Sequence, residues 1–207
     1  MQKRMTIVIS GPSGVGKGTI CEKLREEMQD LAISISFTTR APRPRKDGTM
    51  EEHGVEYFYI TEEEFQKRVQ EGDFLEYAGV HYKHYGTSRG FVEQKKAEGK
   101  DVLLEIDMQG ALQIKAADPD ALLIFILPPD FETLKSRLIG RGSETPEQIQ
   151  KRLSDAKEQI GYAYAYDYIV VNDDLNTAVR EVRGIIDAHA HRTCANKQKI
   201  DEIIHSI

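Results

Sequence analysis

Apolar residues along the chain form short runs, and stretches with helical spacing of polar and apolar residues separate these runs. The strand-like runs are residues 6–10, 102–107, 121–127 and 167–171. The second and third runs are almost continuously apolar, which is typical of parallel strands that helices cover on both faces. Buried strands that alternate with helices predict an α/β fold, a three-layer sandwich around a parallel central sheet.

The segment between the first two runs follows another pattern. Residues 32–39 alternate between apolar and polar side chains and predict one half-buried strand. Residues 57–60 and 74–78 predict two further short strands, and residues 82–88 predict a turn rich in ring and hydroxyl groups. We therefore expect residues 34–88 to form a small mixed-sheet subdomain inserted into the larger fold.

The first apolar run leads directly into a glycine-rich segment that opens a helical pattern. The segment consists of Gly11, Pro12, Ser13, Gly14, Val15, Gly16, Lys17, Gly18 and Thr19. A strand, a glycine-rich turn and a helix in this order predict a phosphate-binding loop (P-loop), in which backbone N–H groups and the positive helix end face an anion. Lys17 can then reach the outer phosphates of a nucleoside triphosphate.

The residue after this lysine departs from the usual P-loop. The common pattern has Ser or Thr there, whose hydroxyl touches Mg²⁺, whereas this chain has Gly18 followed by Thr19. We expect Mg²⁺ to be held through phosphate oxygens and water, or by Thr19. Asp107, which closes a buried strand, is a further candidate, because P-loop proteins place an acidic residue for Mg²⁺ there. Glu105 must lie near the exposed end of that strand or meet a donor; ordinary capping of the strand end is the alternative for both acids.

Basic residues gather directly after residues 32–39. They are Arg40, Arg43, Arg45 and Lys46, and prolines between them exclude a regular helix. Cations held this close repel one another unless an anion lies between them or solvent screens them. In a chain that already binds a nucleotide, this arrangement favours a second phosphate site, with a solvated basic loop as the alternative.

Two helical segments are joined by a glycine-flanked arginine turn at residues 140–142. Arg137 and Arg141 are four residues apart and share a face of the first helix. The second helix begins with a capping pattern at residues 145–148 and carries Arg152. These features predict a mobile lid, whereas a solvated helical hairpin is the alternative.

The C-terminal part of the sequence predicts two more helices. One extends from Leu175 to about His191, and a short one follows Asn196 and packs through an apolar face. That face is formed by Ile200, Ile203, Ile204 and Ile207. We expect the tail to pack either within the chain or against a second copy. His189 and His205, like His191, lack the spacing of metal ligands and are expected at the surface.

Composition and charge exclude several classes of protein. The formal net charge of −6 argues against a surface that coats nucleic acid. No apolar run approaches the roughly 20 residues that span a bilayer, and the N-terminal stretch does not resemble a secretion signal. Cys21 and Cys194 are far apart and lack metal-ligand spacing, so we expect two reduced thiols in a cytoplasmic protein.

In combination, the motifs resemble those of the bacterial guanylate kinases along nearly the whole chain. The matching segments are residues 10–17, 38–43, 85–88, 105–110, 126–129, 140–142 and 169–174. The resemblance implies a single domain at residues 1–207, with a P-loop core, a GMP-binding subdomain and a helical lid. The implied boundaries are 1–33, 89–139 and 165–207 for the core, 34–88 for the subdomain and 140–164 for the lid. The implied reaction is ATP + GMP giving ADP + GDP with Mg²⁺, by direct in-line transfer.

The resemblance also implies roles for individual residues. The implied catalytic residues are Lys17, Arg43, Arg141 and Arg152. Those that bind ATP are the loop residues 11–19 with Arg137 and Asn172. Those that bind GMP are Arg40, Arg43, Tyr57 and Tyr85 at the phosphate and Ser36, Glu76 and Thr87 at the guanine, with Glu105 and Asp107 close by. Members of this family often have Asp where this chain has Glu105, and residues 45–54 are longer than in some relatives.

The chemistry of guanine agrees with these roles. Guanine presents N1–H and a 2-amino group as adjacent donors, so the carboxylate of Glu76 can accept both. Adenine has an acceptor at N1 and would face Glu76 with repulsion and an unmet bond. A site built on such bonds rejects the wrong base by roughly 10⁴ or more. The hydroxyls of Ser36 and Thr87 can donate to guanine O6.

Two other functions stay open at this point. One is a kinase for a different nucleoside monophosphate, which Glu76 and Thr87 disfavour. The other is a non-catalytic guanylate-kinase-like binding module, which Lys17 and the arginines disfavour. The expected ligands are ATP and GMP, with dGMP as a second acceptor, and neither nucleic acid nor a membrane; monomer and dimer are both open.

Overall fold

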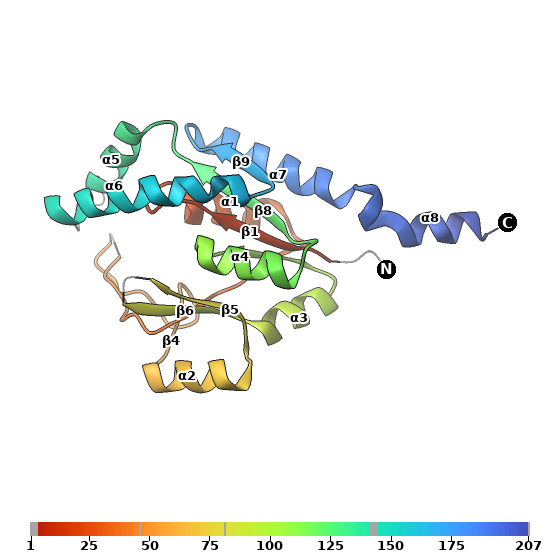
Figure 1. Ribbon diagram of the computed structural model, residues 1–207, viewed down its shortest axis with the longest axis horizontal. Coiled ribbons are helices and arrows are strands. Elements are labelled where there is room, and N and C mark those ends of the chain that lie inside the picture. The colour runs from red at the N-terminus through yellow and green to blue at the C-terminus, as the bar shows by residue number, and fades with distance from the viewer. Residues whose placement is uncertain (1–3, 46, 81, 141–144, 207) are drawn as a thin grey trace.

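Five parallel strands form the central sheet of the computed structural model (Figure 1). The structure describes residues 4–45, 47–80, 82–140 and 145–206. The strand order is β2-β7-β1-β8-β9, with bounds Leu31–Ile33, Asp101–Glu105, Thr6–Ser10, Leu122–Leu127 and Tyr168–Val171. The parallel sheet predicted from the apolar runs is confirmed.

Helices cover both faces of this sheet, so the three-layer sandwich is confirmed as well. The covering helices are α1 (Lys17–Glu27) and α7 (Leu175–Ala190) on one face and α3 (Arg89–Ala97) and α4 (Met108–Ala117) on the other. Side chains of β1 alternate between the two layers. Ile7 and Ile9 pack toward α1 and α7, whereas Val8 packs toward α3 and α4.

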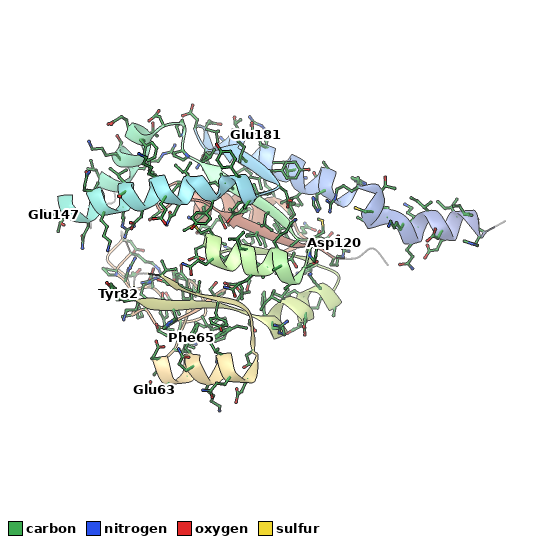
Figure 2. All side chains as sticks on the ribbon, in the orientation of Figure 1. Glu63, Phe65, Tyr82, Asp120, Glu147 and Glu181 are labelled. Atoms are coloured by element: carbon green, nitrogen blue, oxygen red, sulfur yellow. The ribbon has the colours of Figure 1, made fainter. Side chains whose placement is uncertain are left out.

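A second, smaller sheet has mixed strand directions, as expected for the inserted subdomain. Its order is β4-β3-β6-β5, with bounds Phe58–Tyr59, Phe37–Thr38, Lys83–Ser88 and Phe74–Val80. Helix α2 (Glu62–Glu71) covers one face of it. Figure 2 shows Phe65 of α2 directed at this sheet, where its ring centroid lies 4.7 Å from that of Phe74. The small sheet thus has a core of its own.

Two predictions within this region were wrong. Residues 32–39 do not form one strand, because the chain passes from β2 in the central sheet to β3 in the small sheet. The Ser34 N–H donates to Leu103 of the central sheet, whereas the Ser36 carbonyl accepts from Phe58 of the small one. Residues 82–88 are not a turn, since Lys83–Ser88 is strand β6, paired with β5 and β3. Because most side chains of β6 are polar, the sequence shows no alternation of apolar and polar residues, and only the pairing with β5 and β3 identifies the strand.

The two helices of the predicted lid pack on each other. Helix α5 (Phe131–Ile139) contributes Leu134 and Leu138, and α6 (Pro146–Gly161) contributes Ala156. The capping box of α6 is present, because the Thr145 side chain accepts from the Gln148 N–H and the Gln148 side chain accepts from the Thr145 N–H. Of the arginine turn, Arg141 and Gly142 lie outside the described residues.

The C-terminal helices form where the periodicity predicts them, but the expected surface position of His189 is wrong. His189 is not a surface residue: it is 2% exposed and its Nε2 faces the Asp120 carbonyl and the Arg192 guanidinium. A short turn, Thr193–Asn196, leads to α8 (Lys197–Ile204), which lies at the far end of the molecule from the lid (Figure 1). Its Ile203 and Ile204 are 61% and 62% exposed, so these two residues do not pack within the described chain, and packing against a second copy stays a prediction.

No helix of the described residues is long and apolar enough to cross a membrane. Cys21 is buried and Cys194 is exposed, and both are free thiols, as expected.

Candidate active site

The loop after β1 is shaped by glycines that have no substitute. Gly16, which precedes α1, has φ +97°, and a Cβ there would lie 2.5 Å from Nδ2 of Asn172. A Cβ on Gly11 would lie 2.4 Å from the carbonyl oxygen of Ile126. The Asn172 side chain in turn donates to the Val15 carbonyl at 2.8 Å. The loop is thus held closely against the carboxyl ends of β8 and β9, where ligands of open α/β sheets bind.

Positive groups surround this loop. The Lys17 ammonium donates to the carbonyls of Gly11 and Pro12 at 2.7 and 3.2 Å, so it lies over the loop at the start of α1. From α6, Arg152 donates to Oγ of Ser13 at 2.7 Å. The N-terminus of α1 adds its positive dipole. An anion held in the loop would meet all three positive groups.

Arg137 lies at the edge of the same region. Its guanidinium donates to the carbonyls of Asn172 and Asp173, at 2.8 and 3.3 Å. It therefore joins α5 to the segment that follows β9. This contact fixes Asn172, which supports the loop, and it places a cation beside the sequence-predicted ATP site.

A second cationic site lies in the small subdomain. The Arg40 side chain is only 8% exposed, and its guanidinium carbon lies 5.1 Å from the ring centroid of Tyr57. The Tyr57 and Tyr85 ring centroids are 5.8 Å apart. Burial raises the pKa of Tyr57 to about 12, and the charge of Glu105 acts in the same direction, so the hydroxyl stays protonated and can donate. Arg43 is exposed, which leaves its charge available to a ligand.

Glu51 organises this cationic site, although the sequence reasoning did not identify it. Its carboxylate accepts from Nη2 of Arg40 at 3.1 Å, from the Arg43 N–H at 2.8 Å and from the Tyr59 hydroxyl at 2.9 Å, and it forms an ion pair with Nη1 of Arg40 at 2.8 Å. Burial opposes its ionisation, but the hydrogen bonds from Arg40, Arg43 and Tyr59 lower the pKa of Glu51. The sequence signal that could have identified Glu51 is the group of acidic residues that follows the basic loop.

A buried carboxylate lies on the next strands of the small sheet. Glu76 of β5 is 4% exposed and is the register partner of Thr87 on β6, whose hydroxyl donates to Oε1 of Glu76 at 2.6 Å. Burial raises the pKa of Glu76 to about 7; the Thr87 bond opposes that shift and the charge of Asp107 adds to it. Thr87 donates to Glu76 here, rather than standing free for a ligand. Ser36 is half-buried between β2 and β3.

The end of β7 lies between the two sites. A Cβ on Gly18 would lie 3.6 Å from Oε2 of Glu105, so this carboxylate lies beside the start of α1. Asp107 caps α4 by accepting from the Gly110 N–H at 3.0 Å. Burial raises the pKa of Asp107, and the Lys17 charge acts against that shift. Glu105 is thus placed at the exposed strand end, as expected, and Asp107 caps a helix.

A model of the guanylate kinase family matches residues 3–189. The chain belongs to the guanylate kinase family. Guanylate kinases of Clostridium perfringens (strain 13 / Type A) and Symbiobacterium thermophilum are 49% and 46% identical over 196 and 202 residues. The matches cover 95% and 98% of this chain and 88% and 93% of those proteins. A crystal structure of guanylate kinase from Anaplasma phagocytophilum is similar with a TM-score of 0.79 and 31% identity, over 97% of this chain and 95% of that one.

The candidate residues of this guanylate kinase family member form two groups. The P-loop group gathers the loop residues with Arg137, Arg152 and Asn172, and the subdomain group gathers Arg40, Tyr57, Tyr85, Glu76 and Thr87. Thr19 is exposed on α1. A cavity of about 520 Å³ next to His189 belongs to neither group, because its lining includes Thr6, at the start of β1, and α8.

Oxygen ligands for Mg²⁺ are present but sparse. Within the described residues, no group of three or more His, Cys, Asp or Glu side chains could hold a metal ion. Glu105 and Asp107 lie close to the Lys17 side of the loop. Magnesium in kinase sites is typically bound by one or two carboxylates together with substrate phosphates. The residues present therefore fit a metal that reaches the protein mainly through the nucleotide.

Proposed function

We propose that this chain transfers the γ-phosphoryl group of ATP to GMP, and also to dGMP, giving ADP and GDP or dGDP. The observation that carries the proposal is the buried Glu76–Thr87 pair, which lies in the same subdomain as the Arg40–Tyr57–Tyr85 cluster. A carboxylate suits the two adjacent donors of guanine, and an arginine with two tyrosine hydroxyls suits a phosphate. Membership of the guanylate kinase family supports the same reaction.

The P-loop group acts on the donor. Backbone N–H groups of residues 11–19 and the start of α1 hold the ATP phosphates, and Lys17 swings from its carbonyl contacts onto the outer phosphates. Arg152 reaches the loop from α6, and Arg137 extends from α5 to the Asn172 carbonyl beside the loop. These cations stabilise the charge on the transferring group. Arg141 belongs to the same set in our proposal.

The subdomain group aligns the acceptor. Arg40, Arg43, Tyr57 and Tyr85 hold the GMP phosphate, and Ser36 and Glu76 hold the guanine, with Thr87 fixing the Glu76 carboxylate. A phosphate oxygen of GMP attacks the γ-phosphorus of ATP, the bond from that phosphorus to the β–γ bridging oxygen breaks, and ADP leaves. The attacking oxygen is already anionic, so no general base is required. Rate enhancement comes from alignment and from the surrounding cations.

Magnesium would neutralise charge on the β- and γ-phosphates when bound with ATP. We propose that phosphate oxygens and water hold it mainly, with Thr19 and Asp107 as the nearest protein candidates. Glu105 lies between the loop and the subdomain, where it can order water or a hydroxyl of GMP.

We also propose the division of the chain into a core, a GMP-binding subdomain at residues 34–88 and a lid at residues 140–164. The lid, which contains α6, would close over both nucleotides and exclude water, which would otherwise accept the phosphoryl group. The free thiols support a cytoplasmic location.

A coupled assay of ADP formation with GMP, dGMP, AMP and UMP tests the function. GMP and dGMP are expected to be the best acceptors, with AMP slower in kcat/KM by about 10⁴ or more. AMP as the best acceptor would mean that the chain is a kinase for another nucleoside monophosphate. No turnover with any acceptor, despite binding of GMP, would favour the non-catalytic module.

A further inference from the structure

Gly110 occupies a helical position that does not require glycine for its backbone. It is the third residue of α4 (Met108–Ala117), it is buried, and its φ does not lie in the left-handed region. Glycine inside a helix destabilises it relative to alanine. The reason for glycine must therefore lie in what surrounds this position.

The neighbour that requires it is Glu76. A Cβ built on Gly110 would lie 2.2 Å from Oε2 and 2.8 Å from Cδ of Glu76. Both distances are shorter than real Cβ contacts allow. The carboxylate cannot simply swing away, because its other oxygen, Oε1, accepts from the buried Thr87 hydroxyl at 2.6 Å. One carboxylate oxygen is thus fixed by Thr87, and the other lies directly on the helix.

The strand that carries Glu76 is itself docked onto the same helix. The Tyr77 N–H donates to Oε1 of Gln113 at 3.3 Å, and the Tyr77 carbonyl accepts from Nε2 of Gln113 at 2.7 Å. Gln113 lies three residues after Gly110 and therefore on the same face of α4. Gln113 fixes the position of Tyr77 along the axis of α4. The adjacent Glu76 therefore cannot relieve a clash through a shift of its backbone alone.

We propose that Gly110 is a positioning residue for guanine recognition: its missing side chain leaves the space in which the Glu76 carboxylate lies when it accepts the N1–H and 2-amino hydrogen bonds of guanine. The inference rests on the proposed function. A methyl group at residue 110 would displace Oε2 and tilt the carboxylate out of the plane of the base. It would leave the phosphate contacts of Arg40 and the ATP loop untouched.

Steady-state kinetics of Gly110→Ala against the wild type test this role. The KM for GMP is expected to rise by about tenfold or more, the loss expected for one impaired charge-assisted hydrogen bond. The KM for ATP should stay the same, and the preference for GMP over AMP should fall. Gly184→Ala is the matched control, because Gly184 lies in α7 with nothing within 4 Å of its Cβ position. That variant should keep every kinetic constant and gain thermal stability, since alanine is the better helix former.

A double variant separates positioning from a general defect of folding. Glu76→Asp shortens the side chain by one methylene and frees the space that a Cβ at residue 110 would fill. If the inference is right, adding Gly110→Ala to Glu76→Asp raises the KM for GMP no further, and the double variant folds even if Gly110→Ala alone does not.

The inference is overturned if Gly110→Ala leaves the KM for GMP unchanged. It is also overturned if the two substitutions add independently, or if the double variant fails to fold while Glu76→Asp alone folds. These outcomes differ from a failure of the proposed function, in which the wild type itself would not phosphorylate GMP.

Discussion

The donor loop and the acceptor subdomain are built in opposite ways. The loop is one continuous segment, and its shape depends on glycines and on contacts within the segment, such as the bond from the Lys17 ammonium to the Gly11 carbonyl. The acceptor site gathers side chains from β5, β6, the basic loop after β3 and the segment that leads into β4, and helix α4 lies against it. In our proposal the loop therefore binds the phosphates of any nucleoside triphosphate, whereas the acceptor site distinguishes bases.

The difference also concerns how each site is stabilised. Acceptor groups occur in pairs, with Arg40 bound to the partly buried Glu51 and Glu76 bound to the buried Thr87. Substituting one partner of such a pair leaves the other without its hydrogen bond. The free-energy cost of that unpaired group exceeds the net stability that the intact pair contributes. Substitutions in the acceptor site should therefore affect GMP far more than ATP.

Lys17→Met is expected to have the largest effect and to affect the donor side. Loss of the cation that lies over the loop should lower kcat by about 10³, with the fold retained, because charge stabilisation is the main catalytic term here. Rapid-quench assays at saturating ATP and GMP measure it, and circular dichroism checks the fold. Full turnover by a folded Lys17→Met protein would contradict the catalytic role of the loop.

Glu51→Gln should act on the acceptor side alone. Arg40 loses its charged partner, so the KM for GMP should rise by about tenfold, whereas the KM for ATP should not change. Glu52→Gln is the matched control, because Glu52 is largely exposed and pairs with Arg45. Equal effects of the two substitutions would show that Glu51 has no special part in holding Arg40.

The Glu76 carboxyl should make GMP binding depend on pH. Its pKa is raised to about 7, and guanine needs the ionised form, so the KM for GMP should rise as pH falls below about 7, by up to about tenfold per unit. The effect of pH on stability has the opposite sign. Because the folded-state pKa of Glu76 exceeds the usual value of 4.5, ionisation of this carboxyl opposes folding, and the free energy of unfolding falls as pH rises from about 4.5 to 7.

A Glu76→Gln variant isolates this dependence, since the GMP phosphate also titrates. The pH dependence of the KM that survives in Glu76→Gln belongs to the substrate. A wild-type profile identical to that of Glu76→Gln would rule out the carboxyl as the titrating group.

Arg45→Ala should have the smallest effect and marks the outer limit of the acceptor site. Arg45 binds Glu52 and Glu56, and these partly exposed pairs are screened by solvent. The KM for GMP should change by less than about threefold, and the unfolding free energy should change little. Titration with urea measures the unfolding free energy, and steady-state kinetics measure the KM. A tenfold loss of GMP affinity would show that Arg45 belongs to the acceptor site.

The same contrast explains what the sequence could predict. The loop, the apolar central strands and the capped helix at Thr145 depend on neighbours in the sequence, so their patterns identified them. Strand β6 and the break between β2 and β3 depend on which strands pair, and residues 82–88 and 32–39 do not encode this locally. Glu51 was missed because its role depends on how a loop folds back onto Arg40.

Burial near the C-terminus was misjudged for a related reason. His189 belongs to a helix whose buried face includes Val182 and Ile186, and helical spacing alone did not show that this face extends to the histidine. For α8 the periodicity correctly indicated an amphipathic helix, but an apolar face does not specify its partner. In both cases the element was predictable and its environment was not.

In our proposal Glu76 selects guanine. The measurement that tests it most directly is the ratio of kcat/KM for GMP to that for AMP, in the wild type and in Glu76→Gln. A glutamine can accept from one guanine donor but opposes the other, and its amide matches the N1 acceptor and 6-amino donor of adenine. We expect the ratio to fall by about 10²–10³ in Glu76→Gln; an unchanged ratio would contradict selection of guanine by this carboxylate.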